Sequence, residues 1–156
     1  MNWPRYYIDK SNYLHIHIAS IFIAVVLLGG CIQPSCISAT ADVEYVIFGN
    51  GGGASGLVEE YKVTKDGCLF YRDTKAQFDK IGLIKRGEIR KIFRDIRTIN
   101  LSTSKIIKPG NLYFFIRYSE RNKLIIDITW GEPGFLPPQE IIDIYDSLIK
   151  KTKALK

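Results

Sequence analysis

The chain has 156 residues, of which 46% are hydrophobic, 24% are charged and 12% are aromatic, and its formal net charge is +6. This length predicts one domain, and the proportions are those of a folded protein. They exclude a collagen-like chain, a low-complexity chain and a membrane protein with many spans. Hydrophobic residues are concentrated at the start, so the sequence consists of an apolar leader and an ordinary globular body.

The first 30 residues have the parts of a secretory signal. Two bases, Arg5 and Lys10, precede an apolar run at residues 18–28 that is interrupted only by Ser20. That run is shorter than the roughly 20 residues that a membrane-spanning helix needs. A basic start, a short apolar segment and small residues before a cleavage point are typical of a signal peptide.

The sequence Leu28-Gly29-Gly30-Cys31 resembles the lipobox of bacterial lipoproteins. The resemblance implies that residues 1–30 are removed and that Cys31 becomes the lipidated N-terminus. The alternatives are an uncleaved signal anchor and a cytosolic protein with a hydrophobic N-terminal helix. We expect a signal peptide at residues 1–30, a lipidated tether at 31–42 and one domain at 43–156. Acyl chains would anchor this protein to the inner or the outer membrane of a bacterial envelope.

Two further cysteines are Cys36, in the tether, and Cys68, in a predicted strand. In an oxidising compartment they can form a disulfide bond. The alternative is one flexible thiol and one buried thiol, because the sequence does not give the Cα separation. Both histidines, His15 and His17, lie in the leader, so the mature domain lacks a Ser-His-Asp arrangement and we expect no catalytic residue, metal or cofactor.

Alternation and turn residues predict strands at residues 43–48, 57–64 and 68–72, with an Asp66-Gly67 turn before the third. Residues 77–83 are ambiguous. Residues 84–99 have helical spacing, residues 113–118 and 123–130 form a hairpin, and a last helix follows Pro137 and Pro138. The predicted order is β-β-β-α-β-β-α, an α+β domain with two helices packed on one antiparallel sheet.

The predicted helix at 84–99 has a basic stripe opposite its apolar residues. The stripe consists of Arg86, Arg90, Arg94 and Arg97. One interpretation is contact with anionic head groups or an acidic envelope protein, and the other is a solvated face. Nucleic acid is not expected as a partner of an exported protein.

A glycine-rich segment follows the first predicted strand, and it includes Gly49, Asn50, Gly51, Gly52, Gly53, Ser55 and Gly56. The spacing Gly51-x-Gly53-x-x-Gly56, with Asp73 further along, matches the dinucleotide-binding fingerprint. That motif requires a helix directly after the glycines, but residues 57–65 are rich in β-formers. We therefore favour a loop between two strands, which forms a candidate binding surface together with Trp130.

The hairpin has apolar side chains on both faces. Tyr113, Phe115 and Arg117 share one face of the first strand, and Phe114, Ile116 and Tyr118 share the other. This pattern indicates either a central strand covered on both sides or an exposed binding face.

The order of the glycine-rich segment, Pro109-Gly110-Asn111 and Trp130-Gly131 resembles a group of small lipoproteins from Bacteroidetes-like bacteria. That group has no assigned activity, so the resemblance implies an envelope location. We expect a membrane-anchored, non-catalytic binding or structural module. The alternative is a nucleotide- or flavin-binding enzyme that uses the Gly51–Gly56 segment.

Overall fold

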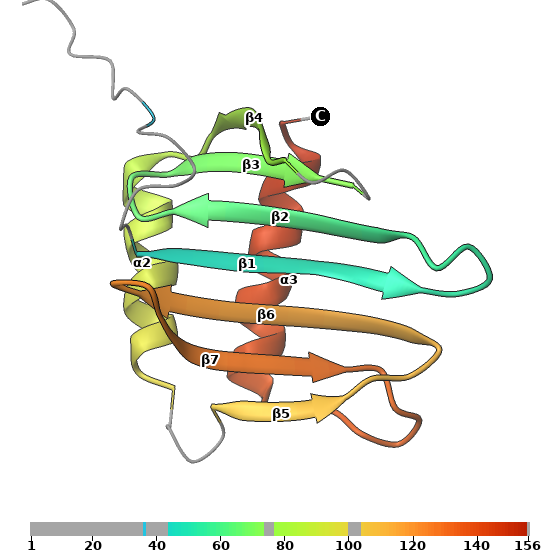
Figure 1. Cartoon of the computed structure of the whole chain (residues 1–156). Coiled ribbons are helices and arrows are strands. Elements are labelled where there is room, and N and C mark those ends of the chain that lie inside the picture. The colour runs from blue at the N-terminus through green and yellow to red at the C-terminus, as the bar shows by residue number, and fades with distance from the viewer. Residues whose placement is uncertain (1–35, 37–43, 74–76, 100–103, 156) are drawn as a thin grey trace, which may run out of the picture. The chain divides into compact units, whose positions relative to one another are not determined.

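The computed structural model of the chain describes residues 36, 44–73, 77–99 and 104–155. They form a seven-stranded sheet with two described helices behind it (Figure 1). The strands are β1 (Tyr45–Gly52), β2 (Val58–Thr64), β3 (Cys68–Arg72), β4 (Asp79–Leu83), β5 (Lys105–Lys108), β6 (Leu112–Glu120) and β7 (Lys123–Trp130), and the helices are α2 (Arg86–Arg97) and α3 (Gln139–Lys153). The signal peptide, Cys31 and most of the tether lie outside the described residues.

The strands lie in the order β4-β3-β2-β1-β6-β7-β5, and all neighbours are antiparallel except β5 and β7, which are parallel. The α+β class is confirmed, but the predicted strand order lacks β4 and β5. Both are edge strands that bury little side-chain area. An edge strand with so little burial leaves almost no alternation in the sequence, so its signal is weak.

The helices bury the faces that their apolar spacing predicts. Helix α2 buries Ile89, Ile92, Phe93 and Ile96. Helix α3 follows Pro138 and buries Ile141, Ile144, Tyr145, Leu148 and Thr152, and Ile149 is partly buried. Burial of each of these apolar side chains contributes about 1.5–3 kcal/mol to the stability of the fold, and this burial holds both helices against the sheet. Within the described residues, neither helix has the length and apolarity that crossing a membrane requires.

Two tight connections set the strand register. Arg121 and Asn122 adopt positive φ angles of 48° and 60° between β6 and β7, which matches the twist of a two-residue hairpin. Gly67, with φ +91°, closes the connection from β2 to β3. The predicted hairpin and the predicted Asp66-Gly67 turn are therefore confirmed.

Substituting two glycines by alanine should have opposite effects. A Cβ atom at Gly49 would lie 2.0 Å from the backbone oxygen of Glu59, whereas a Cβ atom at Gly87 meets no atom within 4 Å. We expect Gly49→Ala to destabilise the fold by about 3 kcal/mol or more. Gly87→Ala should stabilise the fold by about 0.5–1 kcal/mol, because Gly87 lies within α2. Urea denaturation measures both changes, and equal effects would contradict the close packing at Gly49.

Candidate functional site

The glycine-rich segment is largely a strand rather than a loop. Strand β1 extends through Gly49, Asn50, Gly51 and Gly52, and only residues 53–57 form the turn to β2. Strand β2 then pairs with β1 in antiparallel orientation. The residues directly after Gly56 lead into β2 rather than into a helix, so this segment lacks the helix N-terminus that holds a pyrophosphate in a dinucleotide site.

Two of these glycines let aromatic rings of β6 approach the backbone of β1. A Cβ atom at Gly49 would lie 2.9 Å from the Phe115 ring, and one at Gly51 would lie 2.7 Å from the Tyr113 hydroxyl. The two rings lie 6.3 Å apart. The glycines thus serve close packing on one face of the sheet, in the way that an aromatic residue covers a strand glycine.

Trp130 lies on the other face of the sheet. Its ring is 5.7 Å from Phe114 and 5.1 Å from Tyr145, and the side chain is 7% exposed. It belongs to the core beneath α3. The structure therefore does not bring Trp130 and the glycines together in one surface, because side chains that alternate along a strand point to opposite faces.

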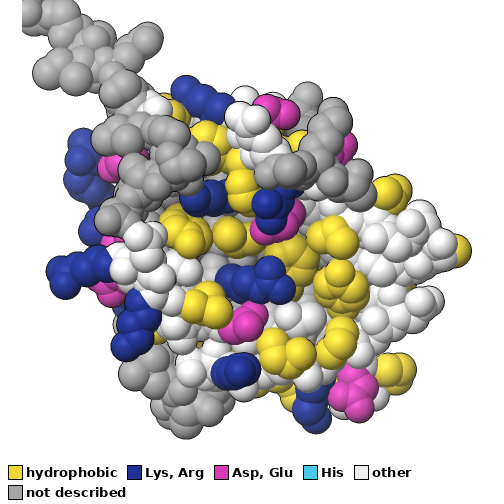
Figure 2. Space-filling model, in the orientation of Figure 1, with side chains coloured by type: hydrophobic (Ala, Val, Ile, Leu, Met, Phe, Trp, Pro, Cys, Tyr) yellow, Lys and Arg dark blue, Asp and Glu magenta, His cyan; other side chains and the backbone are white. Residues whose placement is uncertain are grey.

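The face opposite the helices, which we call the open sheet face, has rows of paired polar and aromatic side chains. Figure 2 shows it with hydrophobic, basic and acidic side chains interleaved. One row crosses the sheet through Phe70, Lys62, Ile47, Arg117 and Asp127, and the next row passes through Arg72, Glu60, Gly49, Phe115 and Thr129. Cross-strand neighbours in such rows contact each other directly.

Charges on the open sheet face are paired within the face. Arg72 bonds Glu60 at 2.6 Å, and Arg117 bonds Asp127 at 3.1 Å. The Arg117 guanidinium also lies 4.9 Å from the centre of the Phe115 ring. A guanidinium packed against an aromatic ring presents a flat surface with little conformational freedom to lose on binding.

Lys62 is the most buried cation of this face, with 8% of its surface exposed. Its ammonium nitrogen lies 4.2 Å from the centre of the Tyr45 ring. Burial, followed by the nearby charge of Arg72, lowers the pKa of Lys62. This residue did not stand out in the sequence, because a lysine in a strand ordinarily indicates a solvent-exposed position.

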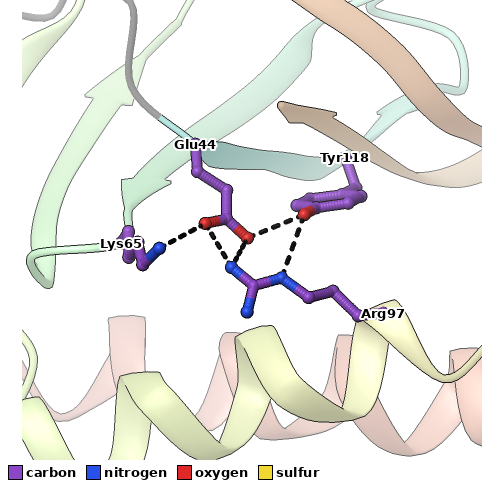
Figure 3. A network of polar contacts seen from close by, with 4 residues as sticks. All are labelled: Glu44, Lys65, Arg97 and Tyr118. Carbon is purple, nitrogen blue, oxygen red and sulfur yellow. Dashed lines mark hydrogen bonds and ion pairs between the residues drawn. The ribbon is translucent and has the colours of Figure 1, made fainter. Parts of the chain in front are cut away.

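A buried carboxylate lies at the start of β1, at the centre of a polar cluster (Figure 3). Glu44 is 7% exposed and accepts a hydrogen bond from the Tyr118 hydroxyl at 2.7 Å. It also pairs with Lys65 at 2.9 Å and accepts hydrogen bonds from the Arg97 guanidinium. The cluster joins the start of β1, the turn after β2, the last residue of α2 and the middle of the hairpin.

The cluster shifts the titration of its members. Burial raises the pKa of Glu44, but hydrogen bonds from Arg97, Tyr118 and Lys65 outweigh burial, and the pKa lies below its ordinary value of 4.5. Burial and the hydrogen bond to Glu44 raise the pKa of Tyr118 to about 12. Glu44 is therefore ionised, and Tyr118 neutral, over the physiological range.

The predicted arginine stripe divides into two parts. Arg97 pairs with Glu44 although 43% of its side chain is exposed. Arg86, Arg90 and Arg94 are also exposed on α2 and lie outside this cluster. Arg94 has a long contact of 3.7 Å with Asp95, which Lys91 holds at 2.7 Å. Among the described residues, Arg86 and Arg90 have no ion-pair partner.

The two cysteines left open by the sequence lie together. Cys36 and Cys68 form a disulfide bond with a Cα–Cα distance of 5.7 Å. Cys68 is the first residue of β3 and is 1% exposed. The bond therefore attaches the N-terminal segment to the sheet beside the turn at Gly67.

No protein-family model matches the chain, and no curated protein matches it in sequence. Within the described part of the chain, no group of three or more His, Cys, Asp and Glu side chains is arranged to hold a metal ion. Two surfaces of the described residues have distinctive side chains: the open sheet face and the basic side of α2.

The Glu44 carboxylate should make stability depend on acidity. Because its pKa in the folded state is below 4.5, its contribution is complete above that pH and is lost as the pH falls through the lowered value. We expect Glu44→Gln to destabilise the neutral protein by about 1–2 kcal/mol. The difference from wild type should shrink in acid.

The control for that experiment is Tyr118→Phe, which removes a hydrogen bond to Glu44 without removing the charge. Its destabilisation should change much less with pH than that of Glu44→Gln. Urea denaturation at a series of pH values measures both variants. If the loss of stability caused by Glu44→Gln stayed the same at the lowest pH at which the protein is folded, the result would contradict the ion-pair role of Glu44.

Proposed function

We propose that this protein is a lipid-anchored protein of the bacterial cell envelope, with Cys31 as the lipidated residue. Its α+β domain is a non-catalytic binding or structural module held close to a membrane. The proposal rests on the Leu28-Gly29-Gly30-Cys31 sequence and on the disulfide bond between Cys36 and Cys68.

The disulfide bond is the observation that carries the proposal. Such bonds persist in exported proteins and are rare in the cytosol, where thiols are kept reduced. Here Cys36 lies five residues after the proposed lipid-bearing cysteine, so both features belong to one short stretch of the chain. The signal sequence and the cysteine pair are independent features, and both favour export.

The open sheet face supports a binding role for the domain. Its guanidinium–aromatic pairs and its cross-strand ion pairs fix large side chains on the face opposite the two described helices. Preorganised aromatic and arginine side chains are common at binding surfaces. A second envelope component is the class of partner that this location would provide.

Mass spectrometry of protein extracted from membranes tests the lipidation. We expect an N-terminal peptide that begins at acylated Cys31, and we expect Cys31→Ser to abolish acylation and to leave the leader attached. A wild-type protein that retains Met1 would contradict the proposal.

Thiol trapping on the same extract tests the compartment. Alkylation before reduction should leave Cys36 and Cys68 unlabelled, and both should react after reduction. The double variant Cys36→Ser/Cys68→Ser should unfold with about 2–4 kcal/mol less stability, since the bond closes a long loop. Complete alkylation without reductant would place the protein in a reducing compartment.

A further inference from the structure

We infer that the exposed arginines of α2, Arg86, Arg90 and Arg94, contact the anionic lipid headgroups of the membrane that anchors the chain. This inference rests on the proposed function, because the lipid at Cys31 supplies the anchor. It adds an orientation: one end of the domain faces the membrane. The occupant of the basic helix face is thus a lipid surface.

Both ends of α2 are fixed where the N-terminal segment meets the sheet. Before the helix begins, the Ile84 amide donates a hydrogen bond to the Gly67 carbonyl at 2.8 Å, next to the disulfide-bonded Cys68. At the helix end, Arg97 pairs with Glu44, which precedes β1. Figure 1 shows α2 crossing behind this end of the strands. We call it the tether end: Glu44, the turn at residues 65–67 and the turn at residues 121 and 122.

The disulfide bond shortens the connection to the lipid. Only five residue steps separate Cys31 from Cys36, and a fully extended chain of that length spans at most about 18 Å. Glu44, the next described residue, is thirteen steps from Cys31, and a fully extended chain of that length spans up to about 47 Å. The bond therefore holds the tether end, and α2 with it, near the headgroups.

Positive charge is concentrated at the same end. Figure 2 shows basic side chains along the margin where α2 lies. The exposed bases of this end include Lys85, Arg86, Arg90, Arg94, Arg121 and Lys123, and they outnumber the acids of its turns, Asp66 and Glu120. The turn at residues 53–57, at the far end, has no charged residue. A basic surface attracts anionic lipid over about one Debye length, roughly 8–10 Å, which the short tether makes available.

The acids near the arginines do not neutralise this face. Glu88 is held by Lys151 at 2.6 Å, and Asp95 is held by Lys91 at 2.7 Å. In addition, Lys85 and Arg86 lie at the N-terminal end of α2, where the helix dipole disfavours positive charge. That unfavourable placement is a second sign that the charges serve a contact rather than stability.

Residue-specific arginine labelling of the membrane-extracted protein in vesicles tests the inference. Phenylglyoxal should modify Arg86, Arg90 and Arg94 several-fold more slowly in vesicles that contain phosphatidylglycerol than in pure phosphatidylcholine. Arg72, the last residue of β3, lies at the opposite end of that strand from Cys68 and should react equally in both. The difference should vanish near 1 M salt, where the Debye length is about 3 Å.

Matched charge variants separate contact at α2 from a general charge effect. Arg86→Gln/Arg90→Gln should abolish the protection of Arg94. Lys80→Gln/Lys108→Gln, which removes the same charge from the two edge strands of the sheet, β4 and β5, should preserve it. The variant Cys36→Ser/Cys68→Ser, whose fold is checked by circular dichroism, should show weaker protection of Arg94. Equal loss in both charge variants would overturn the inference.

The intact mass of the protein in each sample distinguishes failure of the headgroup inference from failure of the proposed function. Acylated Cys31 with equal labelling in both vesicle types overturns the headgroup contact and leaves the lipoprotein proposal standing. A chain without the lipid refutes the proposed function itself. Protection in native membranes, but not in protein-free anionic vesicles, would identify an acidic protein as the occupant and would also overturn the inference.

Discussion

The buried carboxylate of Glu44 is the constraint on which the arrangement of this domain depends. An unpaired charge at 7% exposure would cost several kcal/mol of stability. Lys65, Arg97 and Tyr118 must therefore all contact Glu44 in the folded state. These residues come from a turn, a helix end and a central strand, and one carboxylate fixes all three elements. The position of α2 across the tether end is therefore set by electrostatics as well as by its apolar face.

The two faces of the sheet are organised differently. On the helix side, apolar side chains of β1, β6 and β7 pack under α2 and α3, and Trp130 and Tyr145 lie ring edge to ring face at 5.1 Å. On the open sheet face, Gly49 and Gly51 remove their own side chains so that Phe115 and Tyr113 can approach β1. Burial of apolar side chains beneath the helices stabilises one face, whereas local pairing of rings and charges stabilises the other.

The features that sequence predicts well are those with a local cause. The apolar spacing of Ile89, Ile92, Phe93 and Ile96 gives the α2 face, and Asp66-Gly67 gives a turn, because a helix period and a left-handed glycine are encoded within a few residues. Strands β4 and β5 and the Glu44 cluster depend on partners far along the chain. Glu44 and Tyr118 are 74 residues apart, and only the register of β1 against β6 brings them together.

The start of α2 shows how local preference and tertiary packing can oppose each other within one element. Lys85 and Arg86 oppose the helix dipole, at a cost of about 0.3–1 kcal/mol each, and Gly87 adds about 1 kcal/mol. The helix forms because its four buried side chains contribute about 1.5–3 kcal/mol apiece, which exceeds that cost. Tertiary packing thus allows a local sequence that an isolated helix would not tolerate. The departure from local rules lies beside the disulfide bond, because the Ile84 amide before the helix bonds the Gly67 carbonyl next to Cys68.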